Sequence, residues 1–270
     1  MPLAEHPLTD RITPFPHQSA EYDAVFERWL RDYSIDLVHV RLLSSDSLGL
    51  YAVARQCSVP VVTSIHDFYA LCPTVKLLDE QQRYCAGRCT AGEGECPIEL
   101  WPDRQMPPLK HAAIDRWQSQ FETALGASDA LVTTTAATQS TVMARMPGLG
   151  HVPWAIIPHG RDLRFADSAR RPKPAAGLKV VLLGHLTPAK GGHLVRTLAT
   201  WYPATRIEFH VLGTISPTLI LPAHVVAHGA FQPGAQNEHL VAIGPHVGAV
   251  LSIWPETWCH ALTELWAAGL

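Results

Sequence analysis

The sequence contains few charged residues and no long run of either charge. Only 17% of its 270 residues are Asp, Glu, Lys or Arg, and the formal net charge is -3. Proteins that bind nucleic acid through its phosphates need clustered Lys and Arg, which this chain lacks. We therefore predict no nucleic acid partner.

Three other signals are missing. The first residues, MPLAEHPLTD, lack the basic start and apolar core of a secretory leader, and no apolar run approaches the roughly 18 residues of a membrane span. The dinucleotide fingerprint G-x-G-x-x-G follows none of the predicted strands, which weakens a dehydrogenase interpretation. We predict a cytoplasmic protein, with peripheral association at the inner membrane face as a second option.

The apolar residues are numerous and arranged in a rhythm that predicts an α/β protein. They make up 47% of the chain, which supports a buried core and argues against disorder. Short apolar runs alternate with segments of helical spacing, the pattern of parallel βα units. Strands are predicted at 35–40, 59–65, 130–134, 155–157, 180–183, 207–212, 224–228 and 247–254. Helices are predicted at 19–33, 46–56, 109–125, 136–146, 193–199, 238–243 and 258–268.

One stretch interrupts this alternation and predicts a domain boundary. Between Ala166 and Gly177 the sequence turns to Pro, Ala and Arg, which is typical of a linker. The chain is long enough for two ordinary domains. We predict two Rossmann-like domains, at 1–166 and 167–270.

Four of the six cysteines gather in one short polar stretch. In a cytosolic chain such a cluster indicates a metal more than disulfides, and four thiolates could close a tetrahedral zinc site. The x3 and x6 spacings between the last three differ from the usual C-x2-C, so reduced thiols in a loop and a disulfide formed after purification stay open as alternatives. The candidate ligands of a structural zinc are Cys72, Cys85, Cys89 and Cys96. No metal is predicted for the chemistry itself.

The last twenty residues, LSIWPETWCHALTELWAAGL, predict a strand, a turn and a helix. Glu256 falls in the turn and Glu264 about two helical turns later. Ligands of open α/β sheets bind at the carboxyl ends of strands, where a helix N-terminus also offers unpaired N–H groups to phosphate. A nucleotide-sugar site would use both, although two spaced glutamates alone favour a solvated helix with two incidental carboxylates, and the flanking Trp-Pro-Glu-Thr and Ala-Ala-Gly-Leu shift the balance to the site.

This segment also carries a family resemblance. PETWCHALTELWAAGL is similar to the Glu-x7-Glu signature of the retaining group 1 glycosyltransferases, whose GT-B fold consists of two Rossmann domains facing a cleft. By this resemblance Glu264 holds the ribose hydroxyls of the nucleotide, Glu256 contacts the donor sugar as a catalytic residue, and Thr257 belongs to the donor site.

The resemblance runs from about Asp36 to Leu270 and is strongest to bacterial O-antigen or polysaccharide transferases. The family's first strands and its C-terminal end are absent, so we expect both domains to be incomplete. We then expect the exposed sheet edges to pair with a second copy in a homodimer, or the fold to be smaller and less stable.

A second motif, GHLTPAKGG at 184–192, places Lys190 and Gly191 at the start of a predicted helix. An ammonium and free N–H groups there could bind a diphosphate, and the alternative is a solvent-facing lysine in a turn. The motif resembles the G-R-L-x-x-x-K-G diphosphate loop of the same family. His185 replaces its arginine, which leaves one permanent cation where the family has two.

His66 and Asp67 follow a predicted strand of the first domain. The resemblance implies that a histidine at this strand end touches the donor sugar, so His66 is our second candidate catalytic residue. A histidine at a strand end is otherwise more often structural.

Together these features predict transfer of a hexosyl group from a nucleotide-diphospho sugar to a hydroxyl of a glycan or lipid-linked acceptor, with retention. Two alternatives remain, a nucleotide-sugar epimerase on the same fold and a non-catalytic nucleotide-sugar-binding fragment.

Overall fold

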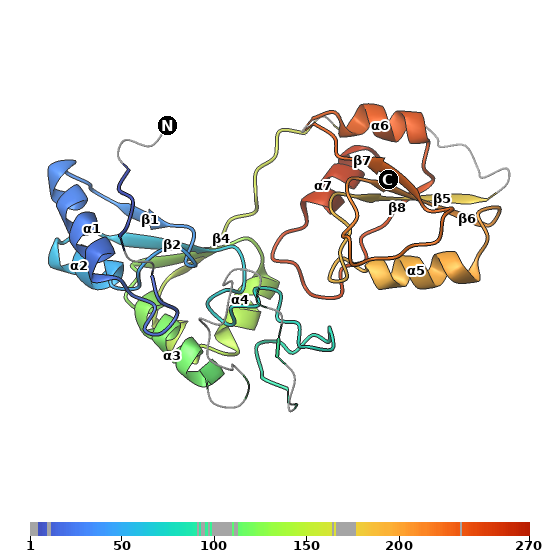
Figure 1. Ribbon diagram of the computed structural model, residues 1–270. Helices are drawn as coiled ribbons and strands as arrows, with labels where there is room; N and C mark the ends of the chain where they lie inside the picture. The colour runs from blue at the N-terminus through green and yellow to red at the C-terminus, as the bar shows by residue number, and fades with distance from the viewer. Residues whose placement is uncertain are drawn as a thin grey trace. The chain divides into compact units, whose positions relative to one another are not determined.

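The computed structural model describes residues 5–9, 12–90, 92, 95–96, 98, 110, 113–163, 165, 177–232 and 234–270. The chain divides into two compact units, Met1–His159 and Gly160–Leu270, and each contains its own four-stranded parallel sheet (Figure 1). The predicted boundary at 166/167 and most of the predicted linker lie outside the described residues.

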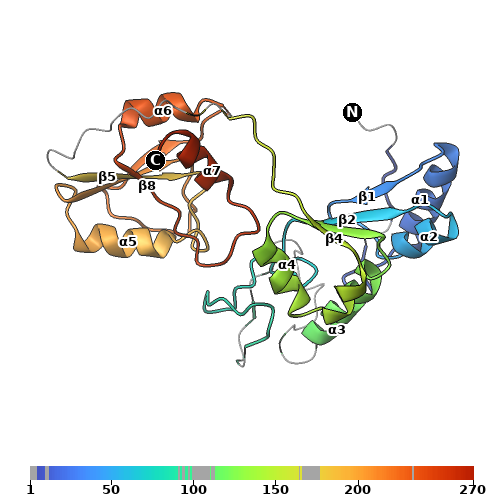
Figure 2. The same ribbon diagram turned by 180° about the vertical axis from the view of Figure 1, so that it is seen from behind.

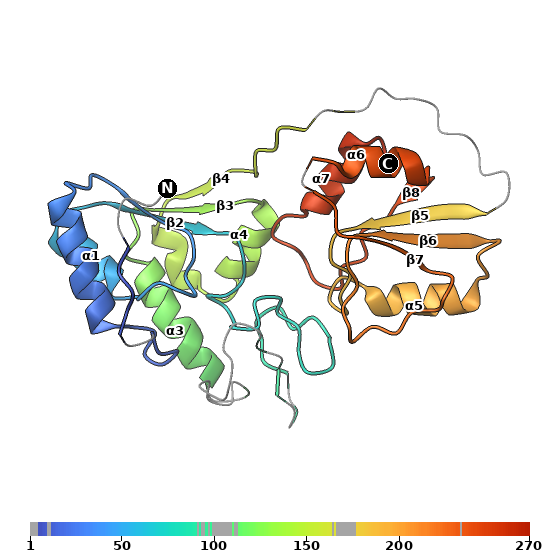
Figure 3. The same cartoon turned by 45° about the horizontal axis from the view of Figure 1, so that its top comes forward.

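The N-terminal unit has strand order β1-β2-β3-β4. Its strands are β1 (Val38–Val40), β2 (Val61–Ile65), β3 (Ala130–Thr133) and β4 (Trp154–Ile156). Its helices are α1 (Ala20–Asp32), α2 (Leu50–Gln56), α3 (Ile114–Leu125), α4 (Ala136–Met143) and the short 3-10 helix η2 (Pro147–His151). Successive parallel strands joined by right-handed crossovers place α2, α3 and α4 on the same side of the sheet, and α3 and α4 are seen there in Figure 3.

The two faces of this sheet differ in burial. Val61, Thr63 and Ile65 of β2 point toward the helices and are at most 2% exposed. Val62 and Ser64 point to the other face and are partly exposed. Among the described residues no helix covers that face.

An aromatic cluster lies on the covered side. Trp117 and Phe121 of α3 are fully buried against Tyr69, and the indole Nε1 of Trp117 donates to the Tyr69 carbonyl at 3.0 Å. The His17 ring is also fully buried, with Nε2 at 2.9 Å from the Tyr69 hydroxyl. Edge-to-face packing of these rings joins the N-terminal segment to the core of the unit.

The C-terminal unit has strand order β7-β6-β5-β8. Its strands are β5 (Leu178–Leu183), β6 (Ile207–Leu212), β7 (Val226–Gly229) and β8 (Val247–Gly248), and its helices are α5 (Gly192–Trp201), α6 (Gln236–Ile243) and α7 (His260–Ala267). Figures 2 and 3 show α5 on one side of the sheet and α6 on the other.

Both faces of this sheet are therefore packed. Val180, Leu182, Phe209 and Val211 form one core with α5 residues, and Val181 and Leu212 form the second with residues of α6 and α7. A sheet covered on both faces needs apolar side chains at successive positions, which the LKVVLL sequence of β5 supplies.

The strand predicted at 247–254 is much shorter than expected. Ala249 N–H still bonds to the Val181 carbonyl of β5, but Ile253 N–H bonds to the Ala189 carbonyl in the loop after that strand. The chain leaves the sheet after β8 because its later hydrogen bonds go to this loop. In α7 the neighbours Leu265 and Trp266 differ, since Leu265 is buried whereas Trp266 is 62% exposed.

No helix in the described part of the chain has the length and apolarity to cross a membrane.

Candidate functional site

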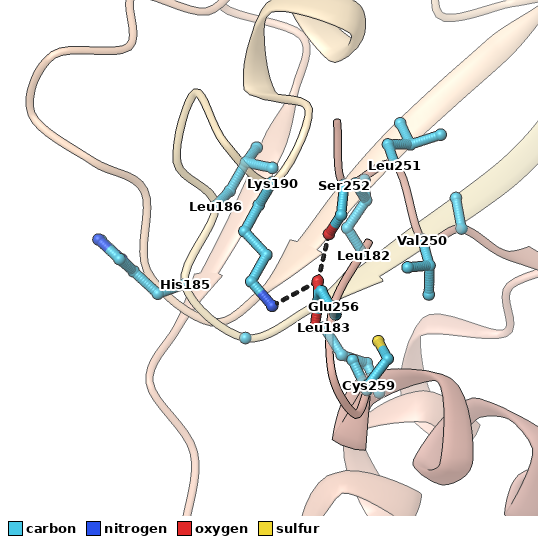
Figure 4. Close-up of a pocket in the computed structure, with 13 residues that line it drawn as sticks. Leu182, Leu183, His185, Leu186, Lys190, Val250, Leu251, Ser252, Glu256 and Cys259 are labelled. Carbon is cyan, nitrogen blue, oxygen red and sulfur yellow. Dashed lines mark hydrogen bonds and ion pairs between the residues drawn. The ribbon is translucent and has the colours of Figure 1, made fainter. Parts of the chain in front are cut away.

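The candidate site lies at the carboxyl end of β5 in the C-terminal unit. Three segments line a pocket there: the end of β5 with its following loop, the extended segment after β8, and the first residues of α7. Its polar lining includes His185, Lys190, Ser252, Glu256 and Cys259 (Figure 4). The sequence predicted that Lys190 and Glu256 share a site, and the structure brings them together.

Glycine is required where the loop meets the segment after β8. Gly191 has a φ of +80°, and a Cβ on it would lie 2.2 Å from the Leu251 carbonyl oxygen. An L side chain would be strained there and would also clash with backbone. The glycine therefore lets the loop end directly against the segment that carries Glu256.

Glu256 is held by two donors. The Lys190 Nζ lies 2.9 Å from Glu256 Oε1, and the Ser252 hydroxyl donates to the same oxygen. The Glu256 side chain is only 10% exposed, whereas that of Lys190 is 43% exposed. A carboxylate so poorly hydrated needs these partners, while the ammonium keeps access to solvent and to an incoming ligand.

Cys259 belongs to this pocket although no motif in the sequence singles it out. It is the N-cap of α7 and lies beside Glu256. Burial, and after it the negative charge of Glu256, raises the pKa of the Cys259 thiol. The thiol stays protonated at neutral pH and is a poor nucleophile.

His185 lines the pocket but does not take the place of a second cation beside Lys190. Its Nδ1 lies 2.7 Å from the Thr214 hydroxyl, in the loop after β6. Figure 4 shows the imidazole turned away from Lys190 and Glu256.

Glu264 lies on α7 and not in the pocket lining. Its carboxylate forms an ion pair with Arg161, near the start of the C-terminal unit, and its side chain is only 14% exposed. The Arg161 guanidinium also contacts Nδ1 of His260 at 3.0 Å. Arg161 was missed by the sequence analysis because only the tertiary structure brings it beside α7.

Thr257 and His66 occupy different settings. Thr257, in the turn before α7, is 6% exposed. His66 follows β2 in the N-terminal unit, where its Nε2 lies 3.7 Å from Asp67, and each side chain is about one-third exposed. Asp67 in turn accepts a hydrogen bond from the Tyr69 N–H at 2.9 Å. The roles predicted for Thr257 and His66 stay predictions.

The four clustered cysteines line one pocket of the N-terminal unit. Burial raises the pKa of the Cys72 thiol to about 12, and the Thr74 hydroxyl donates to its sulfur at 3.2 Å. The Cys85 thiol donates to the Leu77 carbonyl. None of the cysteines forms a disulfide. Among the described residues no group of three or more His, Cys, Asp or Glu side chains is arranged to hold a metal, so structural zinc stays a prediction.

Comparison with known proteins assigns the N-terminal part of the chain. Residues 4–165 match the model of the family described as Glycosyltransferase Family 4. No curated protein matches the sequence significantly.

Solved structures share the fold across almost the whole chain. The Anabaena protein HepE in complex with UDP matches with a TM-score of 0.59 and 14% identity, over 96% of this chain and 64% of that one. The pneumococcal O-GlcNAc transferase GtfA in complex with UDP and GlcNAc matches with a TM-score of 0.55 and 12% identity, over 92% and 44%. The lipopolysaccharide outer core galactosyltransferase WaaB gives 0.53 and 11%, over 93% and 59%.

These likenesses confirm the predicted α/β fold of the GT-B type. The chain spans less than two-thirds of the length of each of these three proteins.

Proposed function

Since the chain belongs to Glycosyltransferase Family 4, we propose that it transfers a hexosyl group from a nucleotide-diphospho sugar to a hydroxyl of a glycan or lipid-linked acceptor, with retention. The observation that carries the proposal is the Lys190–Glu256 pair at the carboxyl end of β5 and the start of α7. HepE and GtfA were each solved with UDP, which makes UDP-sugars the first donors to test.

The pocket supplies part of what departure of a diphosphate requires. Transfer breaks the bond between the sugar C1 and the diphosphate oxygen, forms a new bond from C1 to the acceptor oxygen, and releases the acceptor proton. Negative charge collects on the leaving diphosphate, where the Lys190 ammonium and the N–H groups at the start of α7 stabilise it. The Cys259 thiol is protonated, so it supplies no nucleophile.

When the donor binds, Lys190 changes its ion-pair partner. The ammonium leaves Glu256 for the diphosphate, and Ser252 keeps its hydrogen bond to the carboxylate. Glu256 is then an acceptor for sugar hydroxyls, and Glu264 on α7 is the acceptor for ribose hydroxyls, as the group 1 resemblance implies.

We place this reaction in the biosynthesis of a bacterial surface polysaccharide of the O-antigen type, on the cytoplasmic side of the inner membrane. The support is the group 1 resemblance together with the likeness in fold to WaaB.

Titration calorimetry with UDP, UDP-glucose and uridine tests the proposal. We expect Lys190→Ala to weaken UDP binding by about 1.5 to 3 kcal/mol, the range for hydrogen bonds to charged groups, and to leave uridine binding nearly unchanged. Glu256→Ala is expected to affect UDP-glucose more than UDP. Lys179→Ala is the matched control, because this lysine near the amino end of β5 interacts with Glu208 and not with the pocket.

Two results would contradict the proposal. One is a parent protein that binds no nucleoside diphosphate or nucleotide sugar, and the other is a Lys190→Ala variant with the affinities of Lys179→Ala. Product analysis after incubation with a UDP-sugar separates transfer, which consumes the donor only with an acceptor, from epimerisation, which needs none.

A further inference from the structure

Arg161 makes two contacts to one side of α7. One guanidinium nitrogen, Nη2, pairs with Oε1 of Glu264, and the other, Nη1, lies 3.0 Å from Nδ1 of His260. His260 and Glu264 are four residues apart, so they lie one above the other on the helix. A single planar cation therefore spans the first turn of α7.

The contact with His260 assigns the hydrogen-bonding roles. A guanidinium only donates hydrogen bonds, so Nδ1 of His260 is the acceptor. Arg161 therefore brings a permanent positive charge to the start of α7. His260 follows Cys259 directly and precedes Ala261, and both of these neighbours line the donor pocket.

The pocket is short of positive charge for a diphosphate. Among the described residues that line it, Lys190 is the one permanent cation, and Glu256 neutralises it. His185 is turned to Thr214. A diphosphate with two or more negative charges is bound best by several donors, and guanidinium groups bind phosphate oxygens in pairs.

We propose that Arg161 is a donor-binding residue. It orients the Glu264 carboxylate for the ribose, and its guanidinium contacts the diphosphate, supplying the second permanent cation that the loop at 184–192 lacks. This inference rests on the proposed function, because it concerns the same nucleotide-sugar site.

The experiment compares uridine with UDP in the full chain. For Arg161→Ala we expect about a thirtyfold loss of UDP affinity and about a threefold loss of uridine affinity. The excess of about tenfold for UDP, which equals about 1.4 kcal/mol, measures the diphosphate contact. Arg161→Lys keeps a charge without the planar fork and is expected to lie between parent and Arg161→Ala for UDP.

Arg206→Ala is the matched control. It removes the same charge from the same unit, but Arg206 directly precedes β6 and so lies at the amino end of the sheet. Its affinities for uridine and UDP are expected to equal those of the parent. Thermal unfolding of every variant identifies any that fails to fold, and Arg161→Gln then replaces Arg161→Ala as the milder neutral variant.

The possible outcomes separate this inference from the proposed function. If the parent binds UDP and Arg161→Ala behaves like Arg206→Ala, Arg161 has no role in donor binding while the proposed function stands. If uridine and UDP lose affinity equally, Arg161 only positions Glu264, and the diphosphate contact is wrong. If the parent binds no nucleotide at all, the proposed function fails and this inference fails with it.

Discussion

Both sheets consist of four parallel strands, but they differ in how many of their faces are covered by helices. In β5 the neighbouring residues Val180 and Val181 are both buried, one on each face. In β2 the neighbours Val61 and Val62 differ, since Val61 is 2% exposed and Val62 is partly exposed on a face that no described helix covers. Because both of its faces are buried, the C-terminal sheet tolerates polar substitutions less well than the N-terminal sheet.

The largest expected effect tests this difference directly with one substitution in each sheet. Val181→Asp buries an unpaired carboxylate, and we expect it to lower the free energy of unfolding of the C-terminal unit by about 4 kcal/mol. Val62→Asp leaves its carboxylate in reach of water, and the expected loss for the N-terminal unit is below about 1 kcal/mol. Hydrogen exchange with mass spectrometry reports on the two units separately.

Equal destabilisation by the two substitutions would show that the second face of the N-terminal sheet is buried in solution. Light scattering then distinguishes the cause. A dimer in the parent that Val62→Asp dissociates would identify a second copy as the cover of this face, which differs from the predicted pairing through exposed sheet edges.

The next effect concerns the covered face of the N-terminal sheet, where side chains are as deeply buried as in the two cores of the C-terminal unit. Burial lowers the pKa of His17 to about 4 from the ordinary 6.5. Between these values the folded chain binds fewer protons at this site than the unfolded chain, so stability falls as the pH is lowered. The difference is worth about 3 kcal/mol at ~1.4 kcal/mol per pH unit.

His17→Phe keeps a ring in the aromatic cluster and removes the titration. We expect the stability of the parent relative to this variant to fall by about 3 kcal/mol between pH 7 and pH 4, measured by urea denaturation. Asp46, whose pKa burial raises to about 6, acts in the opposite direction, but it does so in both proteins and cancels in the comparison. A parent and variant with parallel pH profiles would show that His17 is hydrated.

The smallest expected effect concerns the pocket of the N-terminal unit that is lined by the four clustered cysteines. It is measured as thiol reactivity. In chelator-treated protein we expect Cys89 to react first with a thiol reagent because it is exposed. We expect Cys72 to react last, because it is buried and burial raises the pKa of its thiol to about 12. Peptide mapping gives the order. Cys57 and Cys259, outside the pocket, serve as internal controls.

The predicted structural zinc is tested on the same protein. Zinc coordination would protect all four pocket thiols together and leave the two controls unchanged. Protein purified without chelator that contains no zinc, together with labelling that added zinc does not change, would contradict it.

Much of the fold could be predicted because it depends on local pattern. Ser19, the first residue of the helix predicted at 19–33, caps α1, with its hydroxyl accepting from the Tyr22 N–H. Strand and helix ends were less predictable. The helix predicted from 46 begins at Leu50, because the Ser47 hydroxyl accepts hydrogen bonds from Ser19 and Gly49 N–H groups and fixes a turn there.

The sequence by itself indicated that Lys190 and Glu256 belong to one site, because each follows a predicted strand of the second domain and each falls in a motif that resembles the group 1 donor site. Only the tertiary structure decided that Arg161 pairs with Glu264 and that His185 turns to Thr214. The reason is physical. Periodicity and turn chemistry act over a few residues, whereas the partner of a side chain depends on how segments far apart in the chain pack, and Arg161 lies about a hundred residues before Glu264.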